Sequence, residues 1–206
     1  MHAMNHAPDP SPPCRITRVE TLAEIADFLH VARQAMFGDR VATSAPQADL
    51  RDFAAVYASP GGCMLAARDS SAAVVGSIAY RPYDGRFAHL DVPSADTVEV
   101  VRLFIAPAWH RRGLAGELFA HLKQHALQHG VQRMYLHTHP FLPGAQVFWQ
   151  QQGFVVLHQD ADPLWQTIHM QMARLSPQGV RADAILTSSA NRALTSDSSS
   201  LSEDRF

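Results

Sequence analysis

The sequence predicts an α+β protein with one mixed β-sheet flanked by helices. Apolar runs of strand length alternate with segments in which apolar residues recur every three or four positions, the spacing of an amphipathic helix. Taken in order, these segments give β-α-α-β-β-β-α-β-α-β-β. Hydrophobic residues make up 47% of the 206 residues, enough for one sizeable core. We therefore expect a single domain over residues 15–175.

The expected elements have clear breaks between them. A capping box at Thr21 and Glu24 starts the first helix, because each side chain satisfies a free backbone donor of the other residue. Glycines and prolines mark most other boundaries. The expected elements are a strand at residues 15–19, helices at 21–38 and 46–59, strands at 62–68, 72–83 and 97–105, a helix at 113–128, a strand at 131–137, a helix at 143–152, and strands at 154–158 and 164–172.

The two ends of the chain differ in composition from the domain. Residues 1–14 are rich in proline and residues 176–206 in small and polar residues, so we expect both to be disordered. The N-terminus lacks the basic flank and apolar stretch of a signal peptide. Two cysteines, Cys14 and Cys63, are too few for a disulfide scaffold or a zinc site of familiar spacing.

Charge and hydropathy exclude several classes of partner. The formal net charge is −2 and no run of lysines or arginines occurs, so no electrostatic footprint predicts a nucleic acid or an anionic membrane. No stretch approaches the roughly 18 consecutive apolar residues that a membrane helix needs. We expect a soluble cytoplasmic protein.

A loop of small residues joins the strand at 97–105 to the next helix. Gly113, Ala115 and Gly116 leave the first-turn amides unobstructed, and these amides have no acceptor within the helix. The helix dipole adds positive potential there, which suits a phosphate or pyrophosphate. Arg111 and Arg112 add charge. The nucleotide P-loop and dinucleotide patterns are absent. The residues alone leave two alternatives open, an anion site and an ordinary loop.

Two motifs resemble those of the GNAT superfamily of N-acetyltransferases. Residues 110–115 (HRRGLA) match its acetyl-CoA-binding pattern, Gln/Arg-x-x-Gly-x-Gly/Ala, except at His110. Residues 145–154 (AQVFWQQQGF) match its second motif, an aromatic pair before Gly-Phe. The resemblance covers about residues 15–175. It implies the family fold, a mixed and mostly antiparallel sheet that splays between the fourth and fifth strands.

The resemblance implies acetyl-CoA as the acyl donor, bound without a metal. The pyrophosphate would lie on the amides of residues 111–116, and the pantetheine arm would follow the strand before them. A backbone amide near Phe104 or Ile105 would polarise the thioester carbonyl. Trp149 would contact the pantetheine or serve only in the core. The implied contacts are Leu103, Phe104, Ile105, Arg111, Arg112, Gly113, Leu114, Ala115, Gly116 and Trp149.

Glu99 is the first candidate for the general base, because the attacking ammonium must lose a proton. Family members often carry a glutamate at this place in the strand. The alternatives are a solvent-facing strand residue and an ion-pair partner of Arg102 or Arg81. His139 is the second catalytic candidate, with His137 beside it, because an imidazole has a suitable pKa range. For each histidine, an ordinary loop position remains the alternative.

Trp149 departs from the family pattern in a way that bears on proton transfer. Many relatives place a tyrosine there, whose hydroxyl is proposed to protonate the departing CoA thiolate. An indole N–H donates a hydrogen bond but gives up no proton near neutral pH. Water or another group must then protonate the thiolate.

The function that follows is acetyl transfer to a primary amine of a small molecule or peptide, with both substrates bound together. The alternatives are an inactive acyl-CoA-binding regulatory module and a protein-interaction domain. The acceptor would be set by loops at residues 38–48, 83–96 and 138–144, whose composition identifies no substrate. A homodimer is one alternative for the assembly. His121, His125 and His129 recur every four positions, which predicts the edge of a solvated helix face rather than a metal site.

Overall fold

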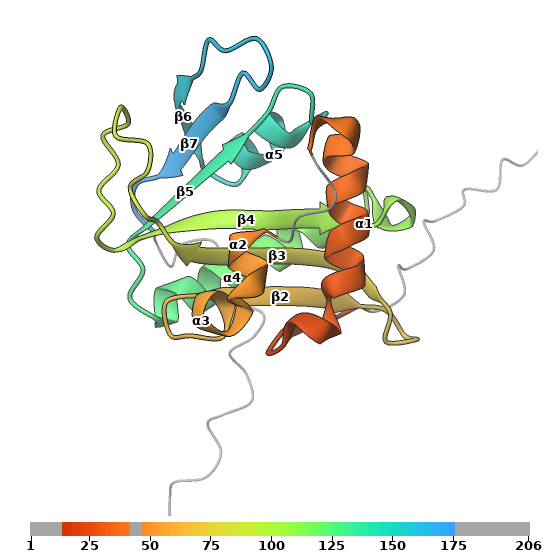
Figure 1. The fold of residues 1–206 in the computed structure, drawn as a ribbon. Coiled ribbons are helices and arrows are strands. Elements are labelled where there is room, and N and C mark those ends of the chain that lie inside the picture. Colours follow the sequence, from red (N-terminus) through yellow and green to blue (C-terminus); the bar gives the residue numbers. More distant parts are fainter. Residues whose placement is uncertain (1–13, 42–46, 176–206) are drawn as a thin grey trace, which may run out of the picture.

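The computed structural model describes residues 14–41 and 47–175, and these form a seven-stranded sheet with helices on both faces (Figure 1). The strand order is β1-β2-β3-β4-β5-β7-β6, in which β4 and β5 are parallel and the other neighbours antiparallel. The elements are β1 (Arg15–Arg18), η1 (Leu22–Glu24), α1 (Ala26–Phe37), η2 (Gly38–Arg40), α2 (Ala48–Arg51), α3 (Phe53–Tyr57), β2 (Cys63–Arg68), β3 (Val74–Pro82), β4 (Thr97–Ile105), η3 (Pro107–Trp109), α4 (Leu114–Gln128), β5 (Arg133–Thr138), α5 (Ala145–Gln151), β6 (Val155–Gln159) and β7 (Ile168–Met172).

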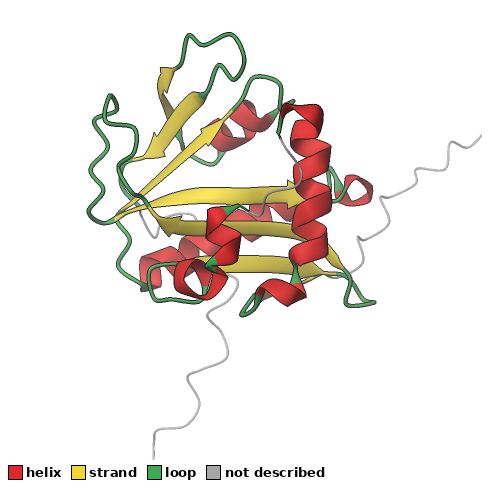
Figure 2. Ribbon diagram, in the orientation of Figure 1, coloured by secondary structure: helices red, strands yellow, loops and turns green. Residues whose placement is uncertain are grey.

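The sheet separates two hydrophobic clusters. Alternate residues of β2 show this: Leu65 and Ala67 belong to the cluster under α4, whereas Met64 and Ala66 belong to the cluster under α1 and α3. A strand covered on both faces needs apolar residues at successive positions, which explains the continuous apolar run in β2. Figure 2 shows α1 crossing one face of β2–β4 and α4 lying on the other. The predicted α+β class with a mixed sheet is confirmed.

The capping box forms, but the helix after it is not continuous. The Glu24 carboxylate accepts a hydrogen bond from the Thr21 backbone N–H (2.9 Å). This box closes the short 3₁₀ turn η1, and α1 begins two residues later at Ala26. Ile25, Leu29 and Ala32 point into the core as predicted.

The second predicted helix consists of two short helices. Asp52 lies between α2 and α3 with φ −103° and ψ 35°, outside helical geometry, so the segment cannot continue as one helix. Phe53 and Tyr57 are buried as expected. The predicted start near residue 46 lies outside the described residues, as do the end segments 1–13 and 176–206.

The prediction of a strand across residues 164–172 is wrong in its first half. The carboxylate of Asp162 accepts hydrogen bonds from the backbone N–H groups of Leu164 (3.1 Å), Trp165 (2.7 Å) and Gln166 (3.1 Å). A side chain that satisfies three successive amides holds a turn and not a strand. The strand β7 therefore begins at Ile168.

Two smaller corrections concern the start of β3 and the start of α5. Asp69 accepts from the backbone N–H groups of Ser71 and Ala73 (2.9 and 3.0 Å), so the turn after β2 is longer than expected and β3 begins at Val74. The helix α5 starts after Gly144, which has φ 75°, so Pro143 precedes the helix instead of opening it.

Within the described residues, no helix is long and apolar enough to cross a membrane.

Candidate active site

The strands β4 and β5 separate halfway along β4. Their parallel pairing ends at Glu99 opposite Tyr135, although β4 continues to Ile105. A β-bulge at Arg102, which has φ 63°, bends β4 at the same place. The Ser77 hydroxyl supports the bulge by donating to the Arg102 carbonyl (2.7 Å). The predicted splay between the fourth and fifth strands is therefore confirmed.

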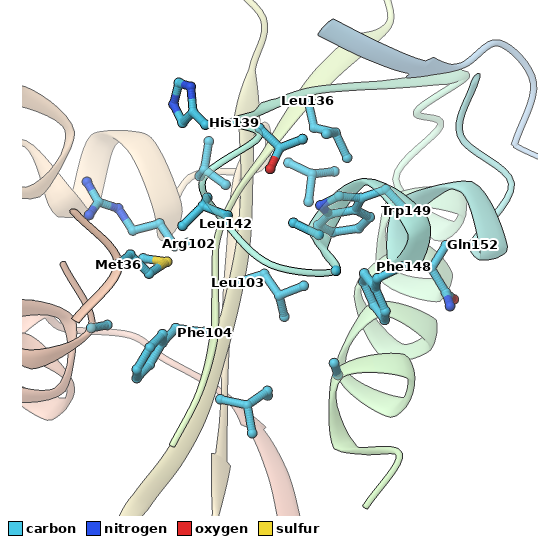
Figure 3. Close-up of a pocket in the computed structure, with 18 of the residues that line it drawn as sticks. Met36, Arg102, Leu103, Phe104, Leu136, His139, Leu142, Phe148, Trp149 and Gln152 are labelled. Atoms are coloured by element: carbon cyan, nitrogen blue, oxygen red, sulfur yellow. The ribbon is translucent and has the colours of Figure 1, made fainter. Parts of the chain in front are cut away.

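One cavity of about 1010 Å³ passes through this opening. Figure 3 shows Leu103, Phe148 and Trp149 on one side of β4, and Met36 and Phe104 on the other. The first side leads to the start of α4, and the second lies beneath α1 and α2. The geometry can hold two ligands that meet at the gap in the sheet.

The start of α4 forms a cradle of backbone amides at residues 111–116. Arg111 and Gly113 have positive φ (59° and 81°), which turns the chain sharply into the helix. Glu117 N–H bonds the Gly113 carbonyl (3.1 Å), so the amides before it lack an intrahelical acceptor. Apart from its own neighbours in the chain and helix, a Cβ on Gly113 or Gly116 would meet no atom of the described residues within 4 Å, so open space adjoins the cradle. These residues fit a diphosphate, because they offer free N–H donors, the positive potential of a helix N-terminus and open space.

His110 occupies the position where the motif has Gln or Arg. Its Nε2–H donates to the Ile105 carbonyl (2.8 Å) and thereby joins the loop to the end of β4. Arg112 lies over the Trp109 ring at 5.0 Å. The departure at His110 leaves the backbone cradle intact.

Trp149 is 6% exposed and lines the cavity. Its ring makes edge-to-face contacts with Phe119, Phe148 and Phe154 at centroid distances of 5.5, 4.9 and 5.3 Å. The side chain therefore belongs to both the core and the cavity wall. Of the residues described as lining the cavity, none is a tyrosine, so this wall offers no phenol to protonate a thiolate.

Glu99 is fully buried (0% exposed) among cationic side chains. Arg81 Nε donates to Oε2 (2.9 Å), Arg86 donates to both oxygens, and His137 Nδ1 donates to Oε1 (3.1 Å). Burial alone raises the pKa of the carboxyl, but hydrogen bonds from His137 and Arg86 and the charge of Arg81 outweigh it and hold the pKa well below its ordinary value. The alternative of a solvent-facing residue is wrong, and the ion pair with Arg81 is confirmed.

The two histidines at the end of β5 line the cavity, whereas Glu99 is not among the described lining residues. His139 is 9% exposed, stacks on Phe141 at 4.9 Å, and donates from Nδ1 to the Trp165 carbonyl (3.2 Å). Burial lowers the pKa of His139. Its Nε2 therefore carries a lone pair at neutral pH. The Nδ1 of His137 is also occupied, by Glu99 Oε1 (3.1 Å).

Asp49 at the start of α2 is a cavity residue that the sequence analysis missed. It pairs with Arg102, which also donates to Gln47 Oε1 (2.6 Å). Arg86, which fixes Glu99, was missed as well. No local pattern marks either residue, because their partners lie 53 and 13 positions away in the chain.

Of the three histidines predicted to line the edge of α4 (His121, His125 and His129), His125 contacts the core. His125 Nδ1 bonds the Tyr80 hydroxyl (2.8 Å), and its ring stacks on His129 at 4.1 Å. Burial, followed by the nearby His129, lowers the pKa of His125 to about 4. This histidine serves in packing.

A mixed sheet that opens beside a helix-terminal amide cradle defines the acyl-CoA N-acyltransferase fold. The family model described as "Acetyltransferase (GNAT) family" matches residues 26–154, more than half of the chain. The chain belongs to this acetyltransferase family.

Solved structures of the family share the fold. An acetyltransferase of the GNAT family from Staphylococcus aureus Mu50 is 16% identical with a TM-score of 0.61, over 79% of this chain and 100% of that one. A phosphinothricin acetyltransferase from Sinorhizobium meliloti, in complex with acetyl-CoA, is 16% identical with a TM-score of 0.61, over 78% and 88%. PaiA N-acetyltransferase from Thermoplasma acidophilum, in complex with coenzyme A, is 14% identical with a TM-score of 0.57, over 78% and 99%. No curated protein matches the sequence.

Proposed function

We propose that the protein transfers an acetyl group from acetyl-CoA to a primary amine of a small molecule or peptide. Both substrates would be bound together, and the amine would attack the thioester directly. The observation that carries this proposal is the cavity, which runs from the amide cradle at residues 111–116 through the gap between β4 and β5 to the face under α1. Acetyl-CoA supplies an activated acyl carbonyl, and the chain supplies binding, orientation and proton transfer.

The free edge of β4 would hold the pantetheine arm. Because β5 pairs with β4 only as far as Glu99, the backbone of residues 100–105 has no strand partner on that side among the described residues. An extended amide-containing ligand can add to such an edge as another strand would. Leu103, Phe148 and Trp149 would form the apolar wall beside it.

Ile105 is the better of the two candidates for the amide that polarises the carbonyl. Ala106 N–H bonds the Val75 carbonyl on β3 (2.8 Å). Backbone groups alternate in direction along a strand, so the N–H of Ile105 faces away from β3 and toward the gap. The Ile105 carbonyl points the same way, since it accepts from His110. An N–H in this position can stabilise negative charge on the carbonyl oxygen.

We assign the role of proton acceptor to His139. It lines the acceptor side of the cavity, and its Nδ1–H is fixed on the Trp165 carbonyl, which leaves the Nε2 lone pair for the ammonium or an intervening water. Glu99 is better suited to positioning than to accepting a proton, because it stays ionised and is occupied by three donors. It would hold His137 and Arg81 in place at the cavity wall. Water would protonate the departing thiolate.

The alternative function, an acyl-CoA-binding module without turnover, is motivated by Trp149 at the tyrosine position. A panel of small-molecule amines and peptide N-termini, assayed with acetyl-CoA by release of free thiol, separates the two. The proposal expects amine-dependent thiol release above the rate of hydrolysis. Tight binding of CoA without turnover on any amine would favour the regulatory module.

A further inference from the structure

Three potential metal ligands converge outside the acetyl-transfer cavity. His89 comes from the loop at residues 83–96, His158 from β6, and Asp160 directly follows β6. Their ligand atoms all lie within 4.8 Å of one another. None of the three is among the described residues that line the cavity. The group is also separate from the histidine row on α4.

The distances suit an ion better than direct contacts. Nε2 of His89 and Nε2 of His158 each lie 3.6 Å from the same Asp160 oxygen, Oδ1. That is too long for a hydrogen bond. Two ligand atoms bound at about 2.0–2.2 Å to one tetrahedral zinc ion are roughly 3.3–3.6 Å apart. Each histidine nitrogen thus stands from the Asp160 oxygen at the separation that a shared tetrahedral ion requires, and the two histidine ligand atoms lie within 4.8 Å of each other.

A buried hydrogen-bond chain orients the carboxylate. His169 Nε2–H donates to the other oxygen of Asp160, Oδ2 (3.2 Å), and the Tyr135 hydroxyl donates to His169 Nδ1 (2.6 Å). Both Tyr135 and His169 are 0% exposed. This chain occupies Oδ2 and leaves Oδ1 directed at the two histidines. In known metal sites, hydrogen bonds of this kind hold a metal-binding carboxylate in its orientation.

The backbone also holds each ligand in place. Asp160 N–H bonds the Thr167 carbonyl (2.9 Å), and His158 is the register partner of His169 across β6 and β7. His89 is presented between two anchored residues: Phe87 packs on His169 at 4.7 Å, and Leu90 is buried. The site therefore joins the 83–96 loop to the β6–β7 hairpin, which lie beside each other in Figure 1.

We infer that His89, His158 and Asp160 form a Zn²⁺ site. Two imidazole nitrogens and one carboxylate oxygen are ligands that zinc accepts in tetrahedral geometry, and a water would take the fourth position. Solvent can supply that water, because the His89 and His158 side chains are 50% and 51% exposed. Bound Zn²⁺ would link the 83–96 loop to β6 at the edge of the sheet. The same loop carries Arg86, the partner of Glu99.

The test is calorimetric titration of the untagged full chain, freed of metal by a chelator, with Zn²⁺. We expect one high-affinity site in the wild type and in H121Q, a control at an exposed histidine of α4. Affinity should fall at least about tenfold in H89Q, H158Q and D160N. Zn²⁺ should also raise the Tm of the wild type and H121Q, but not that of H89Q/H158Q.

Two measurements on the wild type test the inference without depending on how the variants fold. X-ray absorption of the Zn²⁺-loaded wild type should show a four-coordinate site of nitrogen and oxygen ligands that includes two imidazoles. Uptake of no Zn²⁺ by the wild type at 100-fold molar excess would overturn the inference, and so would unchanged binding by folded H89Q/H158Q. Neither measurement depends on acetyl transfer, so the outcome is separate from that of the proposed function.

Discussion

Arg102 holds Asp49 through both carboxylate oxygens, with Nη2 at 2.7 Å from Oδ1 and 2.6 Å from Oδ2. The two side chains are only 12% and 8% exposed. The pair ties the start of α2 to the bulge of β4, and the Tyr57 hydroxyl donates to the same carboxylate. The wall of the acceptor side thus depends on an ion pair between residues far apart in the chain.

Replacing one partner of this pair should cost much more stability than replacing both. R102M leaves the buried Asp49 charge with the more distant Arg81 (3.8 Å) as its cation, which we expect to lower the free energy of unfolding toward the lower end of about 3–5 kcal/mol. R102M/D49L removes the stranded charge and should recover a large part of that loss. Urea unfolding of the three proteins measures the difference. Equal losses in the single and double variants would contradict the proposed role of the pair.

Glu99→Gln should destabilise the protein near neutral pH and much less in acid. The variant removes the anion that Arg81 and Arg86 share and leaves them with Asp49 (3.8 Å) and Asp84 (2.9 Å), a loss toward the lower end of about 3–5 kcal/mol. The pKa of Glu99 is lower in the folded protein than its value of about 4.3 in an unfolded chain. Its contribution is therefore fully present above that pH and is lost as the pH falls through the folded pKa. Unfolding free energies of wild type and E99Q, measured from pH 7 downward, should converge; a constant difference would refute this.

The sequence predicted the order of strands and helices along the chain and the small-residue start of α4, because both depend on local patterns. Apolar runs mark β2–β4, and a glycine-rich helix start marks residues 111–116. It did not predict how Asp162 turns the chain before β7, since that needs the side chain's position. The sequence also left three alternatives open for Glu99: a general base, a solvent-facing residue and an ion-pair partner. Only the folded sheet brings Arg81, Arg86 and His137 to one carboxylate, and this assembly decides how Glu99 ionises.

His139→Gln should remove the acid limb of the pH–rate profile. Burial lowers the pKa of His139, so kcat/KM of the wild type should rise with pH through a pKa below the ordinary histidine value of about 6.5. The variant should lose about 10²–10⁴-fold in rate, the usual contribution of a general base. The assay should use an acceptor amine whose pKa lies well below that of His139, so that the titration of the amine does not overlap that of the histidine. If the acid limb is unchanged in H139Q but disappears in H137Q, His137 and not His139 is the proton acceptor.

Trp149 should be exchangeable for phenylalanine but not for alanine. W149A removes a ring that contacts three aromatic neighbours and should cost about 3–5 kcal/mol of unfolding free energy. W149F keeps most contacts, and we expect turnover within a few-fold of wild type because the indole supplies no proton. Thermal unfolding and steady-state rates measure both effects. Loss of turnover in a folded W149F that still binds CoA would show that the indole N–H takes part in the reaction.

The most direct test of the amide cradle is calorimetry with coenzyme A on the wild type, Gly116→Asp and Gly116→Asn. Gly116 adjoins open space, and an acidic residue in the first turn favours the helix, so both variants should fold. The added carboxylate would repel a diphosphate, whereas the amide of the same shape would not. We predict that the wild type binds CoA, that G116D raises Kd at least about tenfold (1.4 kcal/mol), and that G116N stays much closer to wild type. No uptake of CoA by the wild type, or equal affinity in G116D, would contradict the account.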